Sequence, residues 1–131
     1  MKLLLAALLV IAPASAAAAG LTIKPGETWL FAVKGGEPAN ARKVPFGATP
    51  RAGEIKASLR SFLGTNLTIS NHGGTGFTYR AELLGPDGKA TTARACTLPA
   101  GGKPTFEHWK ESAAAVRLSG FKSAAKGGSC P

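Results

Sequence analysis

Short runs in which apolar and polar residues alternate recur along this chain, and they constrain its fold more than any other feature. The clearest runs are Thr28 to Lys34, Glu54 to Arg60, Thr65 to Asn71 and Phe77 to Leu84. Successive side chains of a strand point to opposite faces of a sheet, so this period predicts strands with one buried face. Clusters drawn from the 17 glycines and 9 prolines separate the runs, as turns do. The pattern therefore predicts an all-β chain.

Three further segments carry weaker strand signals. Ala39 to Phe46 predicts an edge strand, because Pro45 lacks the N–H that a central strand must donate. Ala93 to Leu98 predicts another strand. Residues 105–118 fit either one helix or two short strands, and we expect the strands, joined by one helical turn near residues 108–114.

These segments make about seven strands, which predict a small antiparallel two-sheet sandwich, with a small closed β-barrel as the alternative. Residues 67–83 are expected to form one hairpin around a glycine-rich turn. The runs Leu67-Thr68-Ile69-Ser70-Asn71 and Phe77-Thr78-Tyr79-Arg80-Ala81, on either side of that turn, resemble immunoglobulin-like domains of bacterial envelope proteins. The resemblance implies an immunoglobulin-like sandwich and no particular ligand.

The N-terminal residues 1–19 have the organisation of a cleavable signal peptide. Lys2 precedes an uncharged apolar run, Pro13 follows it, and small residues lead to expected cleavage after Ala16, Ala18 or, preferably, Ala19. A membrane anchor is the alternative, but the apolar run is short for the ~20 residues that a bilayer requires. We therefore expect residues 20–131 to form one exported domain, periplasmic or secreted, with no transmembrane span.

The two cysteines, Cys96 and Cys130, are expected to form a disulfide, since an even number in an exported protein favours pairing. The bridge would pin a small, polar, glycine-rich tail, residues 122–131, which would otherwise fray. In the chain-entropy model a loop of this size stabilises the fold by roughly 3–4 kcal/mol. A redox or zinc role is the alternative, but no Cys-x-x-Cys motif and no obvious metal partners are present.

The chain is basic, with a formal net charge of +9, and such a charge attracts polyanions at long range. The local excess is a basic set that faces a single acidic residue, Glu54. The basic set consists of Arg42, Lys43, Arg51, Lys56 and Arg60. It predicts a binding surface for an anionic glycan or for lipid head groups; the alternative is that the charge only keeps the protein soluble. Nucleic acid is not expected as a partner, because most aromatic residues alternate inward and the protein is exported.

Catalytic chemistry has few candidates in this sequence. The chain has two histidines, His72 and His108, and its one aspartate, Asp87, belongs to a predicted turn. No nucleophile motif, no metal site and no cofactor site is expected. Glu107, His108 and Glu111 are the densest ionisable group and could serve a small envelope hydrolase. The sequence favours a non-enzymatic exported binding or envelope-accessory module, with that hydrolase or a secreted enzyme inhibitor as alternatives.

Overall fold

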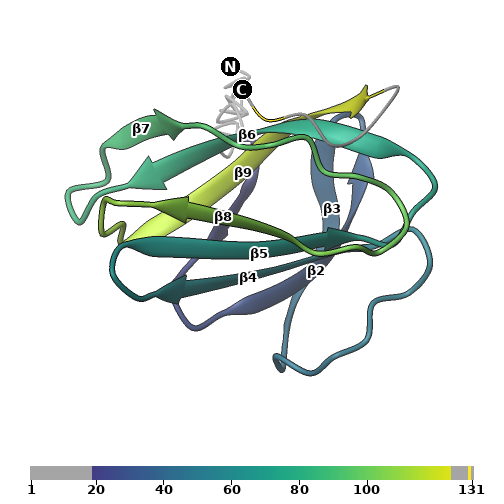
Figure 1. Cartoon of the computed structure of the whole chain (residues 1–131), viewed down its shortest axis with the longest axis horizontal. Helices are drawn as coiled ribbons and strands as arrows, with labels where there is room; N and C mark the ends of the chain where they lie inside the picture. Colours follow the sequence, from purple (N-terminus) through teal and green to yellow (C-terminus); the bar gives the residue numbers. More distant parts are fainter. Residues whose placement is uncertain (1–18, 125–129, 131) are drawn as a thin grey trace, which may run out of the picture.

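The computed structural model describes residues 19–124 and residue 130, and these residues form two antiparallel sheets with no helix (Figure 1). The strands are β1 Leu21–Ile23, β2 Thr28–Lys34, β3 Glu37–Val44, β4 Ile55–Ser61, β5 Thr65–Asn71, β6 Gly76–Leu84, β7 Ala90–Ala93, β8 Thr105–Trp109 and β9 Ala115–Ala124. One sheet has the order β1-β9-β6-β7 and the other β3-β2-β4-β5-β8. The prediction of an all-β sandwich is confirmed, and the sheets do not close into the alternative barrel.

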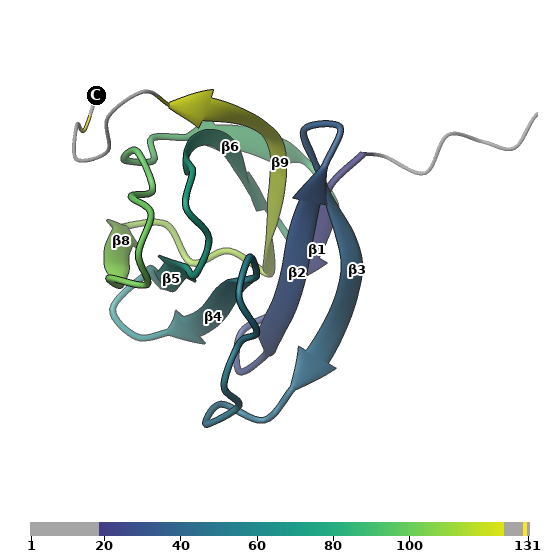
Figure 2. The ribbon, with the colours of Figure 1, turned by 90° about the vertical axis from the view of Figure 1, so that its right-hand side faces the viewer.

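Alternation along the strands puts one face of each sheet into a shared core. Ile55, Ala57 and Leu59 of β4 are buried, and so are Leu67 and Ile69 of β5. The other sheet contributes large apolar side chains that include Leu83, Val116, Leu118 and Phe121. Side by side in Figure 2, β2 and β3 form a hairpin that continues the five-stranded sheet beyond β4. The outer face of β4 is left to carry Lys56, Ser58 and Arg60.

The expected hairpin over residues 67–83 is wrong, because β5 and β6 lie in different sheets. The Asn71 side chain organises the connection: it donates to the carbonyl of Thr75 at 2.6 Å and accepts from the N–H of Gly73 at 3.0 Å. β5 pairs instead with β4 and β8. Alternation shows which face of a strand is buried, but not which strand lies beside it.

The expected strand at residues 93–98 is also wrong. β7 lies just before it, and Cys96 donates its N–H to the Glu107 carboxylate at 2.8 Å rather than to a neighbouring strand. Of the expected residues, Ala93 ends β7 and pairs with Ala81, and Leu98 forms an isolated bridge with Phe77. Nor is there a helical turn at residues 108–114, because the N–H groups of Ala113 and Ala114 bond to the Thr65 hydroxyl and the Leu84 carbonyl. Two strands are therefore present, as expected: residues 105–109 form β8, residues 115–118 begin β9, and residues 110–114 connect them without a helical turn.

The ends of the chain bear on two further predictions. Apart from Ala19, the predicted signal peptide, residues 1–19, lies outside the described residues. The predicted disulfide is confirmed, with Cys96 and Cys130 joined across a sequence separation of 34. Residues 122–124 of the expected tail belong to β9, and residues 125–129 and 131 lie outside the described residues. A three-residue strand, β1, was not predicted; it pairs with β9 at the edge of the four-stranded sheet.

Candidate functional site

The five residues of the basic set lie on two strands and the segment between them. Arg42 and Lys43 are on β3, an edge strand, whereas Lys56 and Arg60 are on the outer face of β4. Arg51 lies in the connection, residues 45–54, which we call the Phe46 loop. The register places Arg42 on the same face of the sheet as Lys56, whereas Lys43, the next residue of β3, points to the opposite face, level with Trp29 and Ala57. The structure therefore brings most of the basic set to one side of the five-stranded sheet, but it gives its members different surroundings.

Arg42 is neutralised by a carboxylate. Its guanidinium donates two hydrogen bonds to Glu54, at 2.6 and 3.0 Å, and the backbone N–H of Arg51 donates a third at 2.8 Å. The bonds from Arg42, followed by the bond from Arg51, lower the pKa of the Glu54 carboxyl to about 2. A bidentate pair of this kind fixes both side chains. Arg42 thus holds the end of the Phe46 loop and is not available to a ligand.

Lys43 is neutralised as well, though more loosely. Its ammonium lies 3.5 Å from the carboxylate of Glu27. The same carboxylate accepts a hydrogen bond from the backbone of Lys24 at 2.8 Å and one from the indole of Trp29 at 3.3 Å. The backbone bond from Lys24 is the main cause that lowers the pKa of Glu27. Glu27 therefore stays ionised and offsets the charge of Lys43.

Lys56 and Arg60 have no carboxylate partner among residues 19–124 and 130. Instead they lie on either side of Ser58 along β4, and both approach the ring of Phe46. The ring centroid is 5.4 Å from the Lys56 ammonium and 4.7 Å from the Arg60 guanidinium carbon. Phe46 itself is 60% exposed. Cation–π contacts at such an exposed ring orient the two cations without cancelling their charge.

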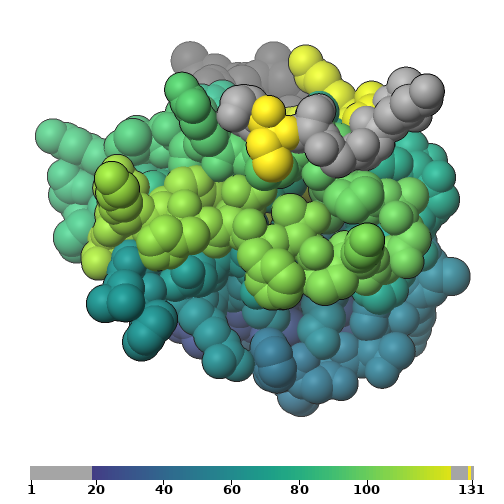
Figure 3. All heavy atoms as spheres, in the orientation of Figure 1, coloured from purple at the N-terminus to yellow at the C-terminus, as the bar shows by residue number. Residues whose placement is uncertain are grey.

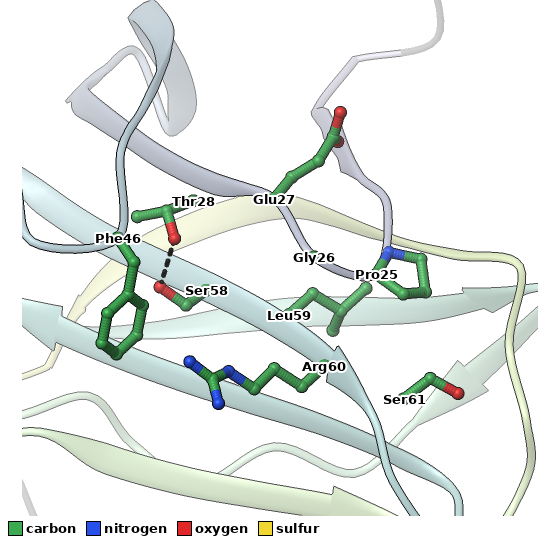
Figure 4. A pocket seen from close by; sticks show the side chains of 9 residues that line it. All are labelled: Pro25, Gly26, Glu27, Thr28, Phe46, Ser58, Leu59, Arg60 and Ser61. Carbon is green, nitrogen blue, oxygen red and sulfur yellow. Dashed lines mark hydrogen bonds between the residues drawn. The ribbon is translucent and has the colours of Figure 1, made fainter.

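Two hollows open beside the Phe46 ring, one next to each cation. The hollow on the Arg60 side has a volume of about 490 Å³ and is also lined by Ser58 and the β1–β2 turn. Figure 4 shows the Arg60 guanidinium directed toward the ring, beside the hydrogen bond of 2.8 Å between Thr28 and Ser58. Glu27, although it borders this hollow, is directed away from Arg60 in the same view.

The hollow on the Lys56 side has a volume of about 340 Å³ and a polar floor. Its floor consists of hydroxyl groups and one imidazole, contributed by Ser58, Thr68, Ser70 and His72. His72 Nε2 lies 3.0 Å from the Ser70 hydroxyl. A side chain at Gly102 would meet the His72 ring at 3.0 Å, so glycine at this position leaves the ring its space. Both hollows fall within the range of small-ligand sites, about 300–1,000 Å³.

The predicted hydrolase group does not assemble as one acid–base cluster. Glu107 and His108 are consecutive on β8, so their side chains leave opposite faces. The Glu107 carboxylate is buried and accepts from the Cys96 backbone, whereas His108 Nδ1 lies 2.8 Å from the Asn66 amide oxygen on β5. Glu111 follows the strand, and all three residues border a hollow of about 370 Å³ near β7. Although the three residues border the same hollow, this does not by itself bring a proton donor of one residue within reach of a proton acceptor of another.

Phe46, Ser58, Ser70 and His72 line the hollows, and none of them was predicted as a site residue. Alternation along β4 could have placed Ser58 between Lys56 and Arg60, because all three share a face. Nothing in the sequence signals that Phe46, ten residues before Lys56, returns to cover that face. Its position depends on the Glu54 hydrogen bonds, which link segments that are separate in sequence.

Residues 19–124 and 130 contain no group of three or more side chains that could hold a metal ion. Across the same residues, no helix has the length and apolar character needed to cross a bilayer. A scan of protein-family models, a search of curated proteins and a search of solved structures each returned no match to this chain.

Proposed function

We propose that this protein is an exported, non-enzymatic binding module for an acidic glycan of the cell envelope, and that Lys56 and Arg60 recognise the glycan's anionic groups. One observation carries the proposal. Two cations without carboxylate partners, among the described residues, lie on either side of an exposed aromatic ring, and each faces a hollow. A chain carrying carboxylates or phosphates along its length could place one group in each hollow, with Phe46 between them.

The floor of the hollows favours a glycan over a lipid head group. Sugar hydroxyls both donate and accept hydrogen bonds, and Ser58, Thr68 and Ser70 present groups of the same kind. Ser70 already bonds to His72, so the floor is held in place before a ligand arrives. Apolar side chains of Phe46, Ala48, Pro50 and Pro104 also line the Lys56 side, but the groups on its floor that can form hydrogen bonds are hydroxyls and one imidazole, which match sugar hydroxyls.

The export and immunoglobulin-like parts of the proposal have separate support. The disulfide between Cys96 and Cys130 suits an oxidising compartment, because cytosolic reductants keep thiols reduced. The N-terminal charge, apolar run and small residues fit a leader that directs the chain to that compartment. The two-sheet antiparallel architecture is compatible with an immunoglobulin-like domain.

The test measures binding of the protein to polygalacturonate, an acidic polysaccharide, and to dextran, a neutral one, by titration calorimetry. The double variant Lys56→Gln/Arg60→Gln should weaken binding to polygalacturonate by at least about tenfold, since each substitution removes a charge-assisted contact. The matched control, Lys34→Gln/Lys122→Gln, removes the same charge from exposed residues of β2 and β9. It should change the affinity by no more than about twofold.

Binding by the parent protein should fall as salt rises, and the fall should be shallower for the Lys56/Arg60 variant. Equal losses in the two double variants would mean that only net charge matters, and that would overturn the proposed site. Equal affinity for dextran and polygalacturonate, or no binding to either, would overturn the acidic-glycan ligand.

A further inference from the structure

The two hollows beside Phe46 differ in whether their charge can change near neutral pH. The hollow on the Arg60 side is bordered by Arg60, whose guanidinium stays charged, and by Glu27, which is directed away from it. The hollow on the Lys56 side contains His72, and histidine is the side chain whose charge ordinarily changes between pH 5 and pH 8. Among the described residues that line the two hollows, His72 alone can therefore add a cation in mildly acidic conditions.

The surroundings of His72 hold its ring at the floor of the hollow. Nε2 lies 3.0 Å from the Ser70 hydroxyl oxygen. The backbone N–H of His72 donates to the Glu54 carbonyl at 2.8 Å, and its carbonyl accepts from the N–H of Gly53 at 2.9 Å. An added Cβ at Gly102 would lie 3.0 Å from Nδ1, so the backbone of that loop packs directly on the ring. The imidazole is therefore fixed beside Ser70 before a ligand arrives.

The charged residues on the elements packed against His72 are Lys56 of β4, Arg51 and Glu54 of the Phe46 loop, and Lys103 of the segment 99–104. Lys56 lines the hollow, whereas Arg51 and Lys103 are exposed. The Glu54 carboxylate is engaged by Arg42 and by the N–H of Arg51. In Figure 3 the blue atoms of the Phe46 loop lie next to green atoms of the segment around residue 100, and residues of both segments line the hollow. Within the described residues no carboxylate lines this hollow, so an anionic ligand would meet Lys56 and His72 without a competing negative charge.

We propose that the imidazolium form of His72 is a further recognition group for the glycan, and that an anionic group in the hollow on the Lys56 side binds together with a proton. This inference rests on the proposed function, because it requires an acidic glycan in that hollow. A carboxylate beside Lys56 and His72 interacts with two cations once His72 is protonated, but with one cation when His72 is neutral. The proton comes from the buffer, and no covalent bond changes.

The hydrogen bond to Ser70 gives protonation a second effect. In a neutral imidazole one nitrogen accepts, whereas in the imidazolium both nitrogens donate. When Nε2 accepts, the Ser70 hydroxyl spends its hydrogen on His72. When Nε2 donates, that hydrogen is free for the ligand. Protonation of His72 thus adds a charge and orients Ser70 as a donor, and both changes favour an anion.

The test measures affinity for polygalacturonate by titration calorimetry at about pH 7.5 and about pH 5.5, at one ionic strength. The parent should bind about three- to tenfold more tightly at the lower pH, because the complex contains an additional charge-assisted contact. His72→Gln should bind with affinities that agree within about twofold at the two pH values. The matched control, His108→Gln, removes the other histidine of the chain and should keep the ratio of the parent. Titration of the polysaccharide or of the chain ends is common to all three proteins and does not affect the comparison.

A second measurement needs no variant and therefore does not depend on how His72→Gln folds. Calorimetry of the parent near pH 6.5, in two buffers with different enthalpies of ionisation, should show a net uptake of protons on binding. The absence of proton uptake, or an unchanged pH ratio in a folded His72→Gln, would overturn this inference. The glycan site would still stand if Lys56→Gln/Arg60→Gln weakened binding more than its charge-matched control. If the parent bound polygalacturonate at neither pH, both the inference and the proposed function would fail.

Discussion

The cations of β3 and those of β4 come from the same basic stretch of sequence, yet they differ in what they can bind. Arg42 is engaged by two hydrogen bonds to Glu54, and Lys43 faces Glu27. Lys56 and Arg60 meet only the ring of Phe46, with no ion pair in the part of the chain that the structure describes. The two pairs of cations therefore carry the same formal charge, but only the pair on β4 is free of carboxylate partners among the described residues.

The difference arises from where the few carboxylates lie. Glu54 immediately precedes β4, and Glu27 immediately precedes β2. Once these strands pair, Glu54 lies beside Arg42 of β3 and Glu27 lies beside Lys43. The β3 cations then serve the fold: Arg42 holds the Phe46 loop, and the loop presents Phe46 to β4. In this way Arg42 on β3 positions the ring that orients the free pair on β4. A count of charges along the sequence treats the two pairs of cations alike, so it does not predict that the pair on β3 is neutralised and the pair on β4 is free.

Removing Glu54 tests that division most strongly. Glu54→Gln should destabilise the protein by about 1–2 kcal/mol, because it ends a bidentate charge-assisted contact at a partly exposed site. Glycan affinity should fall as well, since the Phe46 loop loses its anchor to β3. Urea denaturation and calorimetric titration of the same variant measure the two effects. Unchanged stability with unchanged binding would show that Arg42 and Glu54 do not position the loop.

The pH dependence of stability gives an independent measure of the same contact. The pKa of Glu54 in the folded protein is about 2, below its ordinary value of 4.5, so its contribution to stability is fully present above pH 4.5. That contribution is lost as pH falls from 4.5 through 2, because the unfolded chain binds the proton first. The stability difference between parent and Glu54→Gln should therefore shrink over this range. A difference that stays constant from pH 7 to pH 2 would contradict the assignment.

Fold class was predictable because alternation reports directly on the burial of strand faces. The runs at β2, β4, β5 and β6 were each identified within one residue of their bounds. Strand partners were not predictable, because the register and order of a sheet depend on contacts between distant segments. Asn71 shows this well: its side chain closes the β5–β6 connection in a form that moves the chain to the other sheet. The sequence marks a turn there, but not its direction.

The candidate site was predictable only in part, for a similar reason. Lys56 and Arg60 could be assigned to one face of a strand from their spacing alone. The neutralisation of Arg42 and Lys43 could not, since it depends on the pairing of β2 with β3 and β4. The place of Phe46 over β4 depends on the same pairing and on the bonds to Glu54. The local sequence pattern thus predicted the charged face of β4, whereas tertiary contacts determine which cations of the basic set have no carboxylate partner.

Phe46 lies on the loop that Arg42 holds and contacts both Lys56 and Arg60. Replacing it should have the next largest effect on glycan binding. Phe46→Ser should weaken glycan binding about three- to tenfold, because each lost cation–π contact at an exposed ring is worth roughly 0.5–1 kcal/mol. Stability should change by less than about 1 kcal/mol, since the ring is mostly exposed. Calorimetric titration with polygalacturonate measures the first effect and urea denaturation the second. Unchanged affinity would mean that the ring only rests on the cations and does not orient them for a ligand.

The smallest effects should come from Glu27 and Lys43, whose substitutions should act in opposite directions. Glu27→Gln removes the one carboxylate that borders the Arg60 hollow, so affinity for polygalacturonate should rise about two- to threefold at low salt. Lys43→Gln removes a cation whose charge Glu27 already offsets, so affinity should stay within about twofold of the parent and stability within about 0.5 kcal/mol. Both variants are measured by the same titration. If Lys43→Gln weakened binding as much as Lys56→Gln/Arg60→Gln, the distinction between neutralised and free cations would fail, because a paired and an unpaired charge would then contribute alike.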